Sequence, residues 1–381
     1  MHVQIVRWER SGRDEGKCRH PVRAGLALIL AIIFAAGLSG CYLSDQASRF
    51  LALQARARPA ASLLADPKTP APERDLLERV AKIRAFAVEN IGLRNTKSFR
   101  SLVEIDGDRV ATVVQACAAL SFDRYLWSYP VVGKLPYKGF YDPKDAEKER
   151  DRLKAQGYDV IVRGVDSFST LGWFADPLYS FMESYKDAEL AELVIHEMTH
   201  ATAFSRSPGD FNEELATFVG RSGADEYLAA TRGPDSPDLA EARRGRGDEE
   251  AFASFLRGTA AELEKLYEEK IPDADKRAKK AEIIAARAAL YRKDYAPRFG
   301  SEAYRNFPMD RMNNAYLDLY KLYEGEPALY ADYERAICGG DLRRFVREAV
   351  RLAAARGDPK AVMRAELAAA GVPGYATQPS P

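Results

Sequence analysis

The feature that most constrains this chain is a short motif in an apolar helical stretch at positions 193–201. The run Leu-Val-Ile-His-Glu-Met-Thr-His-Ala places His196 and His200 four residues apart, with Glu197 directly after the first histidine. Residues i and i+4 lie on one face of an α-helix, so both imidazoles can bind one metal ion. Glu197 lies next to that face, where it can meet a metal-bound water, as in zinc hydrolases. The alternative is two ordinary helical histidines beside a glutamate.

The distribution of histidine favours the metal site. The chain has only four histidines, and His2 and His20 lie in a segment that we interpret below as a removed leader. The mature protein would therefore keep only His196 and His200, both inside the motif.

A catalytic zinc usually has three protein ligands and a water, so a further ligand is expected close by. Asp210 or Asn212 is expected to cap a second helix, which returns antiparallel after a Ser-Pro-Gly turn at 207–209. Glu213 and Glu214 open this helix, and only one of them can face the zinc because adjacent helical residues point about 100° apart. The region resembles the gluzincin metallopeptidases, whose third ligand is the Glu of an Asn-Glu pair on the next helix. The resemblance implies Glu213 as the ligand, with Glu214 as the alternative.

Length and charge limit the function classes. A chain of 381 residues with 46% apolar content can form one large domain or two small ones. The 56 basic residues balance the 56 acidic ones, but the first 40 residues hold six Lys/Arg and three Asp/Glu, which leaves about −3 for the rest. This balance argues against nucleic acid as a partner.

The N-terminus predicts export and lipid anchoring. Basic residues precede an apolar run at 24–36, which is typical of a signal peptide over residues 1–40. Leu38-Ser39-Gly40-Cys41 resembles the bacterial lipobox, and this resemblance implies cleavage before Cys41 and lipidation of that residue. Tyr42 follows instead of Asp, which favours the outer membrane, with the protein facing the periplasm. The alternative is a plain membrane anchor, although the apolar run is short for a spanning helix.

Periodicity and turn residues predict an α+β fold. Strands are expected at 110–114, 129–132, 138–141 and 158–163, before the motif helix, and none after Gly223. Helices are expected at 73–90, 142–157, 309–323, 341–356 and 358–370, together with a charged hairpin built around positions 252–266 and 283–291. The segment 231–248, rich in Gly, Pro, Asp and Arg, is expected to be an exposed loop.

The expected architecture is zincin-like, with a small, mainly antiparallel sheet before the motif helix and a predominantly helical C-terminal part. The predicted organisation is a signal peptide (1–40), a lipidated tether (41–72), a catalytic part (73–228), a helical part that completes the cleft (229–371) and a flexible tail (372–381).

Short motifs in order along the chain extend the resemblance beyond the site. Between Cys41 and about Tyr323 the chain is similar to a bacterial family of predicted zinc aminopeptidases. Besides the motif helix, the matching stretches lie at 83–87, 130–133, 136–140, 157–160, 169–177, 211–213 and 313–315. The resemblance implies a peptidase with one zinc ion and a peptide substrate.

One departure concerns the cysteines. The family tends to have Trp-Cys before the Pro-Val-Val stretch, but here Ser128 follows Trp127. The resemblance therefore implies that a disulfide to Cys117 is absent or re-routed to Cys338. Export would permit such a pair, and two buried free thiols are the alternative.

Relatives with this type of site suggest further roles. An edge strand upstream of the motif helix pairs with the substrate in related zincins, and the stretch Ser169, Thr170, Leu171 and Gly172 is suitably placed; a buried aromatic turn is the alternative. Among Tyr316, Tyr320 and Tyr323, we favour Tyr323 as the donor to the developing oxyanion, although core packing explains these tyrosines equally well.

The sequence thus predicts a membrane-anchored zinc aminopeptidase with Glu197 as general base. Glu214 and Asp176 are candidates to bind the free α-amine of the substrate. A zinc endopeptidase of the cell envelope and a non-catalytic envelope lipoprotein are the alternatives.

Overall fold

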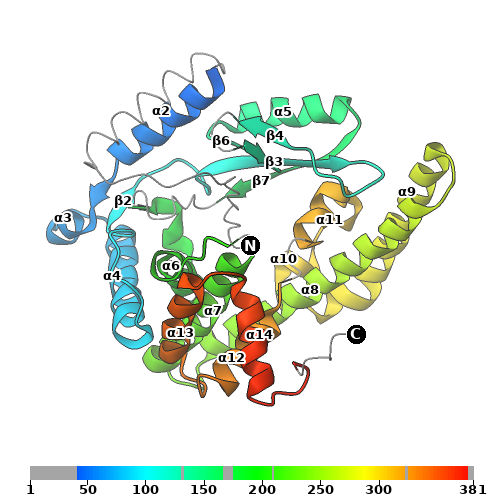
Figure 1. The fold of residues 1–381 in the computed structure, drawn as a ribbon. Helices are drawn as coiled ribbons and strands as arrows, with labels where there is room; N and C mark the ends of the chain where they lie inside the picture. Colours follow the sequence, from blue (N-terminus) through cyan, green and yellow to red (C-terminus); the bar gives the residue numbers. More distant parts are fainter. Residues whose placement is uncertain (1–40, 130–132, 166–174, 208–209, 322–324, 376–381) are drawn as a thin grey trace, which may run out of the picture.

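The computed structural model describes residues 41–129, 133–165, 175–207, 210–321 and 325–375. These residues form an α+β fold with small, mainly antiparallel sheets, as the sequence predicts (Figure 1). Among them, no helix is both long and apolar enough to cross a membrane.

The central sheet has the strand order β6-β3-β7, and both pairs are antiparallel. Val113 of β3 lies opposite Gly139 on one side and Arg163 on the other. The strands are β3 (Ala111–Ala118), β6 (Lys138–Phe140) and β7 (Tyr158–Val165). All three were predicted, and β3 and β7 extend beyond the predicted ends.

Two smaller sheets complete the β structure. They comprise β1 (Arg58–Pro59), β2 (Ser101–Val103) and β8 (Leu178–Tyr179), and a hairpin of β4 (Trp127–Tyr129) and β5 (Gly133–Leu135). Strands β2 and β8 are parallel, in contrast to the other pairs. The predicted strand at 129–132 therefore starts earlier, at Trp127, and its last three positions lie outside the described residues.

Helix α5 (Pro143–Ala155) covers one face of the central sheet (Figure 1). As predicted, Asp142 caps it by accepting a hydrogen bond from the Lys144 amide at 2.9 Å, and Pro143 occupies its first position. Gly157 follows the helix with φ +85°, a conformation that favours glycine.

The largest hydrophobic core joins helices from both ends of the chain. It contains apolar faces of α4 (Ala71–Phe86), α6 (Asp187–Thr202), α7 (Phe211–Arg232), α12 (Pro327–Ala336), α13 (Leu342–Ala354) and α14 (Pro359–Ala369). The predicted catalytic part and the C-terminal helices therefore share one core, since Tyr330, Phe345 and Met363 are buried with Val194 and Val219.

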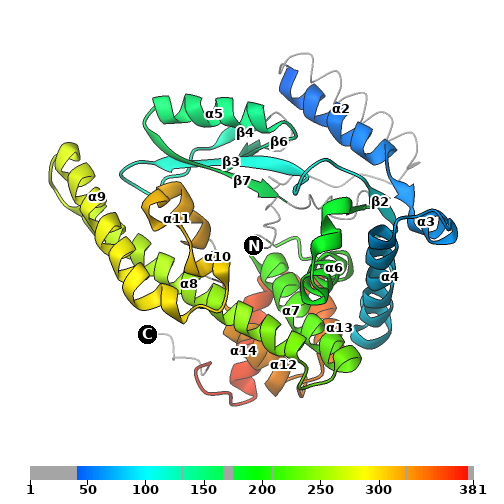
Figure 2. The same ribbon diagram turned by 180° about the vertical axis from the view of Figure 1, so that it is seen from behind.

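A second core lies under a helical hairpin that projects to one side (Figures 1 and 2). The hairpin consists of α8 (Pro237–Glu268) and α9 (Asp273–Leu290), and α11 (Asn314–Lys321) packs between it and the central sheet. A short helix, α10 (Glu302–Arg305), lies beside α8.

The prediction of a loop at 231–248 is wrong for most of that segment. Ser236 caps α8, and Pro237 is its first residue, so the helix begins well before the apolar stripe. Arg243 and Arg246 form ion pairs with Asp225 of α7, which hold this glycine-containing part of the helix in place.

The segment predicted as a tether is folded onto the body. It forms α2 (Cys41–Ala55), β1 and α3 (Ala60–Ala65). The Tyr42 hydroxyl donates to the Gly139 carbonyl, and its ring packs edge-on against Phe140, with 5.6 Å between the ring centroids. The composition of this segment is rich in helix-breaking residues, which led to the prediction of a tether. The contacts that hold it on the body come from residues of the sheet about one hundred positions later in the sequence, so the local composition did not indicate them.

Cys117 and Cys338 are buried free thiols, so the disulfide to Cys117 is absent and not re-routed to Cys338. Burial raises the pKa of Cys117 to about 12 and that of Cys338 to about 11, which keeps both in the thiol form at neutral pH.

The Asn-Asn-Ala motif at 313–315 forms a buried connection between the helical part and the sheet. The fully buried Asn314 side chain donates to the carbonyls of Ala118 and Ser121, at 2.9 Å each, and accepts from the Tyr267 hydroxyl at 2.7 Å. All its hydrogen-bonding groups are therefore used to join α11 and α8 to the end of β3.

Glycine in α7 lets α6 and α7 pack closely. A Cβ at Gly220 would lie 3.0 Å from the Glu192 carbonyl oxygen and 3.2 Å from the Cβ of His196. Any larger side chain would therefore push α7 away from the motif helix.

We expect Gly220→Val to destabilise the fold by about 1–3 kcal/mol more than Gly245→Val, because the new side chain overpacks the interface at position 220, whereas the change in helix propensity is common to both variants. Gly245 is the matched control, since it lies inside α8 and a Cβ there would meet nothing within 4 Å. Urea unfolding of both variants would measure the difference, and equal free energies of unfolding would contradict close packing at Gly220.

Candidate metal centre

The motif helix α6 is buried on most sides. Leu190, Val194, Ile195 and Met198 are at most 1% exposed and pack in the main core. The remaining face carries His196 and His200, whose Nε2 atoms lie 3.1 Å apart. The core therefore fixes the rotation of the helix and directs both imidazoles toward α7.

The connection from α6 to α7 is fixed by one side chain. Asn212 accepts a hydrogen bond from the Ser205 amide and donates to the Ser205 carbonyl, each at 2.8 Å. Asp210 occupies the position before the helix without a side-chain capping bond, so the predicted cap is replaced by this pair of bonds. The bonds fix the first turn of α7, which begins at Phe211, two residues before Glu213.

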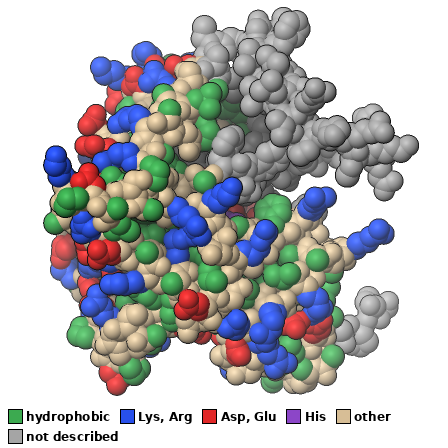
Figure 3. Space-filling model, turned by 90° about the vertical axis from the view of Figure 1, so that its left-hand side faces the viewer, with side chains coloured by type: hydrophobic (Ala, Val, Ile, Leu, Met, Phe, Trp, Pro, Cys, Tyr) green, Lys and Arg blue, Asp and Glu red, His purple; other side chains and the backbone are tan. Residues whose placement is uncertain are grey.

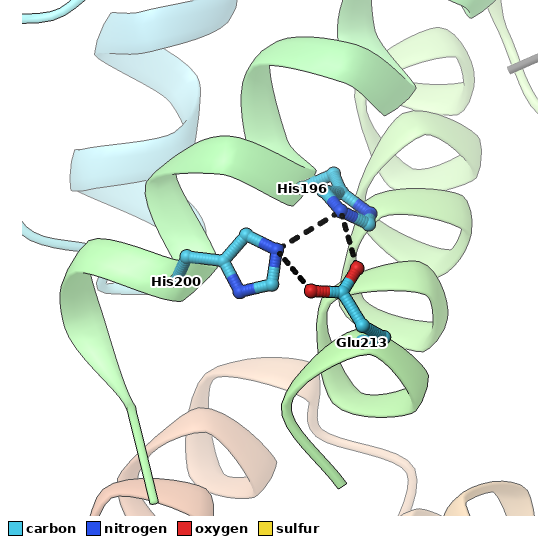
Figure 4. Close-up of side chains that lie close together, drawn as sticks. All are labelled: His196, His200 and Glu213. Carbon is cyan, nitrogen blue, oxygen red and sulfur yellow. Dashed lines mark hydrogen bonds and ion pairs between the residues drawn. The ribbon is translucent and has the colours of Figure 1, made fainter. Parts of the chain in front are cut away.

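The Glu213 carboxylate faces both histidine rings and completes a triangle with them (Figure 4). Its carboxylate oxygens are 3.5 Å from His200 Nε2 and 3.8 Å from His196 Nε2. The three ligand atoms lie within 4.8 Å of one another, and the group could hold a metal ion. Two ligands at about 2.1 Å from a tetrahedral zinc lie roughly 3.4 Å apart, which fits these separations.

The arrangement of donors itself favours a cation. Two imidazole nitrogens face each other at 3.1 Å and also face a carboxylate, so one proton cannot satisfy every lone pair. A cation bound between them would satisfy all three groups. The residues therefore fit a divalent metal.

Burial shifts two of these groups in opposite directions. It lowers the pKa of His200 to about 4, so the ring is neutral at neutral pH, as a metal ligand must be. Although 34% of the Glu213 side chain is exposed, burial together with nearby Asp210 raises the pKa of Glu213 to about 8. Without a cation, Glu213 is therefore mostly protonated at pH 7.

The Glu197 side chain belongs to the buried part of α6, with 7% of the residue exposed. Figure 3 shows a small area of histidine at the surface, with Lys and Arg side chains around it. His196 is the more accessible of the two ligands, at 14% side-chain exposure against 3% for His200.

Glu214 is not part of the metal-binding group. Its carboxylate accepts hydrogen bonds from Lys360 at 3.0 Å and from the Tyr330 hydroxyl at 2.9 Å. These partners from α12 and α14 hold it away from the histidines, so it is engaged neither as the alternative ligand nor as an open site for a substrate amine. No local pattern in the sequence pointed to Lys360 or Tyr330.

The other predicted site residues are distributed differently. Ser169, Thr170, Leu171, Gly172 and Tyr323 lie outside the described residues, and their roles stay predictions.

Tyr316, Tyr320 and Asp176 lie among the described residues and make contacts outside the candidate metal site. Tyr316 and Tyr320 belong to the second core, with their hydroxyls 3.3 Å apart. The Asp176 carbonyl accepts from the Phe99 amide at 2.6 Å, a contact of the sheet region.

We expect metal binding at pH 7 to release close to one proton from Glu213, because its pKa of about 8 must fall when a cation binds. Calorimetric titration with Zn²⁺ in buffers of different ionisation enthalpy would measure the number of protons released. The Glu213→Gln variant should release about one proton fewer at pH 7, and the difference should decline above pH 8. Equal release by both proteins at pH 7 would contradict Glu213 as a protonated ligand.

Comparison with known proteins gives one match. The model of the family described as "Putative aminopeptidase" matches residues 41–362. Neither the curated proteins nor the solved structures include a significant match. The family match covers the candidate metal ligands, the central sheet and most of the C-terminal helices. The chain therefore belongs to this aminopeptidase family.

Proposed function

We propose that the protein is a zinc-dependent aminopeptidase of the cell envelope. The observation that carries this proposal is the convergence of His196 Nε2, His200 Nε2 and the Glu213 carboxylate on one point. Membership of an aminopeptidase family supports peptide hydrolysis as the reaction. Two imidazoles and one carboxylate form a ligand set that suits catalytic zinc and leaves a position open for water.

The proposed mechanism assigns a role to each residue. His196, His200 and Glu213 would hold the zinc, which when bound would make a water more acidic and polarise the substrate carbonyl. The Glu197 carboxylate accepts the proton of the attacking water. It then passes this proton to the nitrogen of the departing amine, acting as base and then as acid.

Glu197→Gln should retain zinc and lose roughly 10²–10⁴-fold in kcat, because an amide cannot accept the proton. Peptide cleavage and zinc content would be measured on the same preparation, with and without a chelator. Glu189→Gln is the matched control, since Glu189 lies on the same helix. The side-chain oxygen of a glutamine there can still accept the hydrogen bond that the Lys186 backbone N–H donates. Zinc-loaded Glu197→Gln with undiminished turnover would refute the assignment.

The same assay separates the alternatives. An aminopeptidase requires a free α-amine, so N-acetylation of the peptide should abolish cleavage. Equal cleavage of free and acetylated peptides would identify an endopeptidase instead. A protein that binds zinc and cleaves neither would have a structural site; such sites usually have four protein ligands, whereas the group found among the described residues has three.

We also propose that the mature protein begins at a lipidated Cys41 and is anchored in the outer membrane, facing the periplasm. The support is the basic and apolar leader that ends in Leu-Ser-Gly-Cys. Because α2 starts at Cys41 and packs on the body, the lipid would hold the folded domain close to the membrane.

Cys41→Ser should abolish the mass increase expected for a lipidated N-terminus. The variant should also no longer occur as processed protein in the membrane fraction. Intact-mass measurement and fractionation would test this. Retention of a processed Cys41→Ser protein in the membrane fraction, as for the wild type, would exclude anchoring through this cysteine.

A further inference from the structure

The first turn of α7 carries two adjacent glutamates with different partners. Glu213 faces His196 and His200, whereas Glu214 faces Lys360 and Tyr330. Adjacent residues of an α-helix point about 100° apart, so the rotation of this turn determines both directions together. Any contact that fixes Glu214 therefore also fixes the direction of Glu213.

The contacts of Glu214 are short and shielded from water. Both of its oxygens lie 3.0 Å from Lys360 Nζ, and one lies 2.9 Å from the Tyr330 hydroxyl. The side chains of Glu214 and Lys360 are 12% and 17% exposed, and Tyr330 is fully buried. Charge-assisted hydrogen bonds of this kind are stronger and more directional than those between exposed groups.

Tyr330 also lies close to the backbone at the beginning of α7. Its hydroxyl is 3.4 Å from the carbonyl oxygen of Phe211, the first residue of the helix. Asn212 fixes the position of this end of the helix through Ser205, on the side of the connection from α6. Position and rotation of the turn are thus fixed by different residues.

We propose that Lys360 and Tyr330 are positioning residues for the metal ligand Glu213, an inference that rests on the metal site proposed above. They hold Glu214 against α12 and α14, and Glu213 consequently faces the two histidines. The C-terminal helices then belong to the metal centre although they supply no ligand to it. Removing the contacts of Lys360 and Tyr330 with Glu214 therefore weakens metal binding.

The test measures the Zn²⁺ dissociation constant of the purified protein by competition with a chromophoric chelator. Lys360→Met, which removes the charge and preserves the length, should raise this Kd by about 10-fold or more, as expected for loss of a residue that orients a ligand. Tyr330→Phe should raise it in the same direction. Lys360→Arg, which can still pair with Glu214, should restore most of the affinity.

Arg364→Met is the matched control. Arg364 lies one turn further along α14 and pairs with Glu326, an acidic residue with which Lys360 also pairs at 3.1 Å. Its loss therefore removes an ion pair of the same cluster but no hydrogen bond of Glu214. Its Kd should stay within about twofold of the wild type, since a substitution that leaves the ligands and their supporting contacts intact preserves affinity. The thermal unfolding midpoint of each metal-free variant would be measured in parallel.

A purely structural role would give a different result. In that case Lys360→Met and Arg364→Met would lower the unfolding midpoint alike and leave the Kd unchanged, which overturns the positioning role. If Lys360→Met fails to fold, Tyr330→Phe decides the question. A wild-type protein that binds no Zn²⁺ would instead refute the metal site itself, so the two failures are distinguishable.

Discussion

The close antiparallel packing of α6 on α7 is the contact on which the candidate metal centre depends. It requires a residue without a side chain at Gly220, where the two backbones approach, and the clamp between Asn212 and Ser205 at the connection. With both in place, Glu213 faces the two histidines across the interface. Two helices set further apart could still carry every ligand, but the donors would be too far apart for one ion.

Burial at this interface disfavours the charged forms of both Glu213 and His200. In the metal-free protein, ionisation of Glu213 opposes folding as pH rises from 4.5 toward about 8, because burial disfavours the carboxylate. Protonation of His200 opposes folding as pH falls from 6.5 toward about 4, because burial disfavours the imidazolium. A bound divalent ion would stabilise the ionised Glu213 carboxylate and would require the neutral form of His200. Both metal binding and folding therefore favour a neutral His200.

Buried polar side chains join parts of the chain that are distant in sequence. Asn314 ties α11 to the end of β3, and Lys360 ties α14 to the first turn of α7. Such groups are costly to bury unless all their hydrogen bonds are made, so they specify one arrangement of the helices. Both lie within the stretch matched by the family.

The sequence by itself determined the features that depend on local pattern. The α+β class, the central strands and the placing of His196 and His200 on one helical face follow from the periods of helix and strand. The Asp142 cap follows from the Asp-Pro pair that begins α5. The tertiary structure alone decided that the glycine-containing segment before 248 is helical, that residues 41–65 fold onto the body, and that Cys117 and Cys338 stay apart. The resemblance implied Glu213 as the ligand, but only the tertiary structure shows why Glu214 is directed elsewhere, since it is held by Lys360, 146 residues away. The spacing of residues along the sequence determines which side chains share one face of a helix. The residues that a side chain contacts on other helices are determined only when the core has formed.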